Sequence, residues 1–397
     1  MEDLLKTTPK EKIYDKLEEW IDFIEDQAMV IVLETQDDVN AYVMFETLND
    51  RGLRVSKADL VKNYLFGKAG KRLDEVKERW SNMVTSLEVI GADDSILDFL
   101  RYYCTLEYGL TREKDLFRVI KDNVTSKNSA VTFTDQLKDF APSYAAILST
   151  DHSKWKNKYP IGIKRALKTL PIFNISQIRC LLLAISYHFS PREAEKAFSA
   201  CVCWIVRLLI GSAGRVGRVE DTYAKIAYDI HHGNIHRTAK AVEKKIIPSL
   251  ATDEEFTIAF STTRVSKAPL ARYYLETLER YEIGSTKAPE LVVNPNPQEV
   301  NLEHVIPQNP TKKWNGLSMD ECQNLSSRLG NLALMLAEDN VAVDQATFEK
   351  KRETYEQSDI SWTNSLYEYD DWGKEEIDKR QLEMAEAAVR CWPLKIR

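Results

Sequence analysis

Amphipathic helical patterns follow one another through most of the first 282 residues, and this succession constrains the fold more than any other feature. Residues 10–26, for example, place Ile13, Leu17 and Trp20 on one helical face. Further helices are expected at residues 38–50, 56–66, 72–88, 94–108, 112–123, 134–149, 161–169, 175–188, 190–211, 219–232, 236–247, 253–261 and 267–282. Residues 28–36 instead have the Val- and Ile-rich pattern of a strand. The sequence therefore predicts a mainly α-helical protein.

The helix that begins at Ser190 and Pro191 is expected to be the buried centre of the middle domain. Serine followed by proline is typical of a helix start. The second half of this helix, through Gly211, is apolar on nearly every face.

Charge is unevenly distributed along the 397 residues, although the net charge is only −7. Residues 1–150 carry −8, residues 151–272 carry +10 and residues 273–397 carry −9. A basic middle region of this kind is suited to a phosphate backbone, whose neutralisation releases counterions. Solvated helix faces are the alternative explanation. The residues expected to hold a DNA duplex are Lys164, Arg165, Arg207, Arg215 and Arg218. No apolar run of about 18 residues is present, so we expect a cytoplasmic protein without a membrane partner.

Residues 301–351 contain the densest group of chemically active side chains. Two strand-like segments, 300–306 and 331–336, flank a loop, and a helical pattern at 346–357 follows. This order predicts a ββα unit, which begins after a Pro-rich linker at 284–300. His304 suits a general base, because a neutral imidazole can take a proton from water near pH 7. Neighbouring strand residues point to opposite faces, so a joint role for His304 and Glu303 requires a twist or bulge.

The pattern Glu303-His304-x-x-Pro307, then Arg328-Leu329-Gly330-Asn331-Leu332, then Asn340, resembles HNH (His-Me finger) nucleases. More narrowly, it is similar to the nuclease half of GmrSD-type, modification-dependent (type IV) restriction endonucleases. The resemblance implies that His304 is the catalytic base and that Asn331 orients it. It also implies one divalent metal, Mg²⁺ with Mn²⁺ as the alternative, held by Asn340 and by Glu303. A salt bridge is the alternative role for Glu303. Lys351, or its neighbour Lys350, would hold the scissile phosphate, and Arg328 would contact DNA.

Phe45-Glu46-x-Leu48-Asn49-x-Arg51-Gly52 resembles the second half of the ParB-like nucleotidase domain of the same enzymes. By this resemblance Asn49, Arg51 and Gly52 are nucleotide-binding candidates. A helix-end turn is the alternative interpretation. The Asp-Gly-Gln-Gln-Arg stretch of that domain does not occur in the sequence. We therefore expect nucleotide hydrolysis to need a missing N-terminal half or a second chain.

The expected organisation is a partial nucleotidase or sensor domain (1–70), a basic helical domain (71–283), the linker (284–300) and an HNH-like ββα-metal domain (301–397). The expected function is metal-dependent hydrolysis of modified phage DNA in an anti-phage restriction system. The first alternative is a non-catalytic helical sensor or interaction subunit with a degenerate nuclease domain. The second alternative is an RNA-directed toxin with the same site.

Overall fold

The computed structural model describes residues 13–27, 57–88, 95–156, 160–211, 216–282, 299–310, 314–343 and 345–396. The chain divides into two compact units, Met1–Ser56 and Lys57–Arg397. In the first unit, helix α2 (Ile13–Asp22) and its π-helical extension η2 (Phe23–Gln27) occupy the range that the sequence assigns to a helix. The following predictions lie outside the described residues: the strand at 28–36, the helix at 38–50, Asn49, Arg51 and Gly52, Arg215, and nearly all of the linker.

Helices make up the larger part of the second unit, which confirms the prediction of a mainly α-helical protein. These helices are α4 (Lys57–Ala69), α5 (Leu73–Glu88), α6 (Ser95–Tyr108), α7 (Leu116–Asn123), α8 (Lys127–Leu148), α9 (Ile161–Thr169), α10 (Arg179–His188), α11 (Pro191–Gly211), α12 (Val216–His231), α13 (Ala239–Ile246), α14 (Asp253–Phe260) and α15 (Ala268–Glu282). Helix α8 starts seven residues earlier than predicted. The reason is local, because Ser126 and Ser129 form a capping box that closes the first turn.

Helix α11 is buried on several faces, as its sequence predicts. Phe198, Trp204 and Leu208 are each 1% exposed or less. The helix packs against α9, α13 and α14. These contacts account for the apolar residues on its buried faces, whereas Leu209 near its C-terminal end is exposed.

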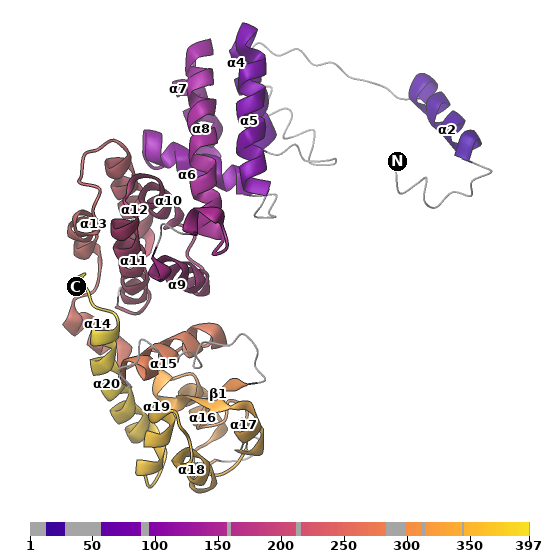
Figure 1. The fold of residues 1–397 in the computed structure, drawn as a ribbon. Coiled ribbons are helices and arrows are strands. Elements are labelled where there is room, and N and C mark those ends of the chain that lie inside the picture. Colours follow the sequence, from indigo (N-terminus) through magenta and orange to yellow (C-terminus); the bar gives the residue numbers. More distant parts are fainter. Residues whose placement is uncertain are drawn as a thin grey trace. The chain divides into compact units, whose positions relative to one another are not determined.

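The predicted ββα unit is present near the C-terminus (Figure 1). Strand β1 (Val300–His304) pairs antiparallel with β2 (Leu332–Leu336), with Glu303 opposite Ala333 and His304 opposite Leu332. The helices around the strands are α16 (Met319–Ser326), α17 (Ala337–Val343), α18 (Phe348–Glu356), α19 (Ser361–Asn364) and α20 (Lys374–Cys391). The sequence pattern predicted α18 but placed α16 in a loop. The start of α16 is a capping box of Ser318 and Glu321, a local signal that the strand-based interpretation passed over.

Helices α14 and α15 pack with the C-terminal elements, although they precede the predicted linker. Helix α14 lies along α20 (Figure 1), and α15 contacts α20 and β2. The buried carboxylate of Glu279, on α15, accepts hydrogen bonds from the amides of Ser361 and Trp362 at the start of α19. On α20, the Gln381 amide donates to the carbonyls of Phe260 and Thr263. The C-terminal module therefore begins upstream of residue 284.

The segment that follows α20 attaches this module to the helical region. The Trp204 indole on α11 donates to the carbonyl of Leu394 at 3.1 Å. Glu243 on α13 accepts from the amide of Ile396. Among the described helices, none combines the length and apolarity that crossing a membrane requires.

Candidate active site

His304 closes strand β1 and carries a half-buried imidazole. Burial lowers the pKa of this ring below its usual 6.5, and the ammonium of Lys351 lowers it further. None of the described residues hydrogen-bonds the ring. His304 therefore offers a largely neutral imidazole whose nitrogens have no protein partner in the described part of the chain, which is the form that accepts a proton.

Asn331 holds the backbone that follows His304. Its main-chain carbonyl accepts from the amide of Val305 at 3.0 Å. Its side-chain oxygen accepts from the amide of Ile306 at 2.9 Å, and its side-chain nitrogen donates to the carbonyl of Ile306 at 3.1 Å. The same amide group also donates to Ser326 and accepts from the indole of Trp372. Because Asn331 is fully buried and uses both side-chain atoms, it fixes the path of the chain after His304.

Glu303 and Lys351 face the interior rather than the surface that carries the His304 ring. The Lys351 ammonium lies 2.5 Å from the Glu303 carboxylate and donates to the carbonyl of His304 at 3.0 Å. Tyr355 donates its hydroxyl to the same carboxylate at 3.2 Å. Exposed fractions are 3% for Glu303 and zero for Lys351. Burial raises the pKa of Glu303, although Lys351 opposes this shift.

These contacts correct two predictions. Strand β1 pairs in regular register through Glu303 and His304, so no bulge brings the two side chains to one face. The Glu303 carboxylate accepts from Lys351 and Tyr355 through the same oxygen and is 3% exposed, so in this structure it is the partner of a buried ion pair. Lys351 is fully buried and cannot reach a scissile phosphate. The neighbouring Lys350 is exposed on α18.

Asn340, the other predicted metal ligand, keeps its side-chain oxygen available in the described structure. It lies on α17, and its side-chain nitrogen donates to the carbonyl of Leu302 at 3.3 Å. This bond joins α17 to β1 and leaves the amide oxygen without a donor in the described structure. No three His, Cys, Asp or Glu side chains among the described residues gather as a metal site. An ion such as Mg²⁺ keeps several waters and needs few protein oxygens, so Asn340 fits it.

Two arginines predicted to contact DNA, Arg207 and Arg328, lie in the interior. They are 0% and 6% exposed, respectively. Their guanidinium groups are bound within the protein: Arg207 to Trp392, Ala251 and Asp253, and Arg328 to Ser261, Gln381 and Asp378. A buried guanidinium that is already paired is not free to meet a phosphate. Both predictions of DNA contact are therefore corrected.

The other predicted DNA contacts come from α9 and α12. Arg165 is exposed and Lys164 is half-buried, both on α9. Arg218 lies in the first turn of α12, but its side chain is not among those described. Lys164 and Arg165 are thus the two predicted cations that the structure places at the protein surface.

Arg380 supports the same site and was missed as a functional residue. It lies on α20, is 1% exposed, and donates to the carbonyls of Gly330 and Leu332, on either side of Asn331. Burial lowers its pKa to about 10. Its distance from Asn331 in the sequence, 49 positions, gave no local signal of this contact.

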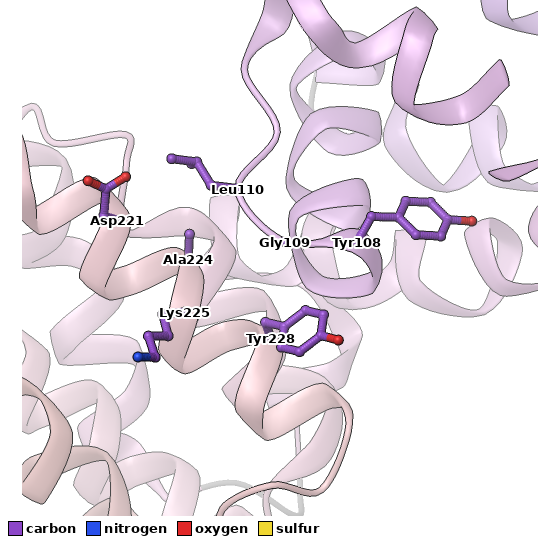
Figure 2. A pocket seen from close by; sticks show the side chains of 7 residues that line it. All are labelled: Tyr108, Gly109, Leu110, Asp221, Ala224, Lys225 and Tyr228. Atoms are coloured by element: carbon purple, nitrogen blue, oxygen red, sulfur yellow. The ribbon is translucent and has the colours of Figure 1, made fainter. Parts of the chain in front are cut away.

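One open hollow of about 350 Å³ lies elsewhere, between the end of α6 and helix α12 (Figure 2). The side chains that line it, among them Tyr108, Lys225 and Tyr228, point in different directions rather than toward a common centre (Figure 2). None of the predicted site residues lines this hollow. The chemistry proposed for His304 therefore does not involve it.

Comparison with known proteins gives one match to part of the chain. Residues 250–387 match the family model of the C-terminal domain of GmrSD restriction endonucleases. The matched range starts before α14 and contains every candidate from Glu303 to Lys351. A search of curated proteins found no match to the chain. The family match supports a nuclease role of the restriction-endonuclease kind, with DNA as the substrate.

Proposed function

We propose that the chain is an HNH-type DNA endonuclease in which His304 activates the attacking water. The observation that carries this proposal is the His304 ring itself, half-buried and without a hydrogen-bond partner in the described structure. The backbone that carries this ring is fixed by hydrogen bonds, from Lys351 to the His304 carbonyl and from the Ile306 amide to Asn331. A ring that only stabilised the fold would be expected to use its nitrogens within the protein. The match at residues 250–387 supports the same reaction class.

In the proposed reaction, a ring nitrogen of His304 takes a proton from water as the oxygen attacks phosphorus. The bond from phosphorus to the 3′ oxygen breaks, and the leaving oxygen acquires a proton from solvent. Asn340, through its amide oxygen, is the residue that would hold a divalent ion, with water completing the coordination. When bound, such an ion supplies positive charge to the phosphate and the leaving oxygen.

We propose that DNA binds across the basic region 151–272. Lys164 and Arg165, which lie at the surface of this region, would contact its phosphates. This region carries +10, whereas the C-terminal 125 residues carry −9. Phosphate binding by the helical region would offset the repulsion of DNA by the acidic catalytic end. We further propose that the substrate is modified phage DNA, in keeping with the restriction-endonuclease match.

The purified chain is expected to nick plasmid or phage DNA in the presence of Mg²⁺ and to stop when EDTA is added. Agarose gels of supercoiled plasmid, together with modified and unmodified phage DNA, measure the reaction. Calcium, which binds oxygen ligands but is larger than Mg²⁺, serves as the matched control ion. Cleavage of RNA alone would favour the toxin alternative. Absence of cleavage on every substrate, with the protein folded, would favour the non-catalytic sensor.

The pH dependence of cleavage follows from the environment of His304. Its pKa lies below 6.5 because burial and the Lys351 ammonium both disfavour the imidazolium. The neutral form is the base, so activity falls only as the pH drops through this lowered pKa. Single-turnover rates between about pH 5 and about pH 8 are expected to give an acidic limb centred below 6.5. A midpoint at or above that value would contradict His304 as the base in this environment.

A further inference from the structure

Helix α18 presents one buried face to the end of strand β1. Phe348, Lys351 and Tyr355 are spaced three and four residues apart, so they share one side of the helix. All three are 1% exposed or less. Two of them, Lys351 and Tyr355, bind the carboxylate of Glu303. Phe348 stacks on Trp372, which in turn donates to Asn331. This face of α18 therefore contacts Glu303 directly and is linked to Asn331 through Trp372.

The burial of Lys351 is not explained by stability alone. Removing an ammonium and a carboxylate from water is costly, and an apolar pair of similar volume is often as stable or more so. What an apolar side chain cannot provide is a hydrogen bond to a backbone carbonyl. Lys351 gives that bond to His304, the residue whose ring the reaction uses.

We propose that Lys351, held by Glu303, is a positioning residue that fixes the main chain of His304 from inside the module and so sets the place of its imidazole. The proposal rests on the endonuclease function proposed above. It assigns Lys351 no contact with phosphate or metal. Asn331 restrains the residues after His304, and Lys351 restrains His304 itself, so the two act on successive peptide groups.

The test compares Lys351→Met with the double variant Glu303→Gln/Lys351→Met, in which no uncompensated buried charge remains. Lys379→Met is the matched control, since it removes an exposed lysine from α20 of the same module. Three experiments are made: thermal unfolding for the midpoint, steady-state DNA nicking for kcat and KM, and hydrogen exchange at the amides of Val305 and Ile306.

The double variant is expected to unfold near the wild-type temperature while its kcat falls about 100-fold with KM unchanged, because a displacement of about 1 Å has an effect of this size. Amide exchange at Val305 and Ile306 is expected to be about tenfold faster. The Lys379→Met control should retain kcat and slow exchange. A rise in KM at constant kcat would overturn the proposal, because it would indicate that Lys351 binds substrate.

Wild-type kcat and unchanged amide exchange in the folded double variant would equally overturn it. Failure of the proposed function has a different signature, since the wild-type protein would then cleave no DNA. In that case hydrogen exchange still tests the positioning role, because the two amides report on the backbone whether or not cleavage occurs.

Discussion

Replacing His304 by alanine is expected to reduce DNA nicking by about 100- to 10,000-fold, the contribution of a general base. The fold should survive, because the ring is half-buried and none of the described residues hydrogen-bonds it. The neighbouring backbone is held by Asn331 and Lys351 through main-chain atoms of residues 304–306, which alanine retains. Rates of plasmid nicking measured with saturating enzyme, together with circular dichroism and thermal unfolding, check both parts.

His236→Ala provides the matched control for His304→Ala. It removes an exposed histidine from the basic helical region, in the segment between α12 and α13. Its nicking rate should equal that of the wild-type protein. If His304→Ala cleaves DNA undiminished, His304 is not the base and the proposed function is wrong. If both variants lose activity with intact folds, the histidines act in DNA binding instead.

Replacing Asn331 by alanine is expected to lower the free energy of unfolding by about 4 kcal/mol and to abolish detectable cleavage. The amide group of Asn331 makes four hydrogen bonds in a fully buried position. Removing it leaves the amide and carbonyl of Ile306 and the indole of Trp372 without their partner, and each such loss costs about 1–3 kcal/mol. Urea unfolding measures the change, and plasmid nicking measures the activity.

Asn324→Ala is the control for this prediction, because Asn324 is exposed on α16 within the same module. Its unfolding free energy should change by less than about 0.5 kcal/mol. Asn331→Asp separates the two halves of the interaction. It retains an acceptor for Ile306 and Trp372 but cannot donate to Ile306 and Ser326. A small effect of Asn331→Ala, below about 1 kcal/mol, would show that these hydrogen bonds do not hold the site.

The elements of the C-terminal module follow from local patterns. The apolar segments around Glu303 and Asn331 become β1 and β2, and the helical pattern at 346–357 becomes α18. Period-two and period-3.6 spacing depends on neighbouring residues alone, which is why it is visible in the sequence. Helix α16 also begins at a local signal, the capping box of Ser318 and Glu321, although this segment was predicted to be a loop.

Such local patterns do not predict contacts between the ends of different helices. One example is His231, the last residue of α12. In the folded chain it lies 2.7 Å from Glu107 on α6 and 3.0 Å from His188 on α10. The two partners are 124 and 43 positions away in the chain. Only the packing of α6, α10 and α12 brings them together.

The sequence by itself determined the helical class, the ββα elements and His304 as a candidate base, because periodicity and residue type are local properties. It could not determine which charged side chains face water. Arg207, Arg328 and Lys351 have the same chemistry as surface cations, yet each is buried against partners that lie up to 185 positions away. Burial depends on which segments pack together, and an ammonium or guanidinium surrounded by carbonyls and carboxylates becomes a support. The tertiary structure therefore decided that Lys351 and Glu303 lie in the interior, beneath the His304 backbone, and not on the surface that carries its ring.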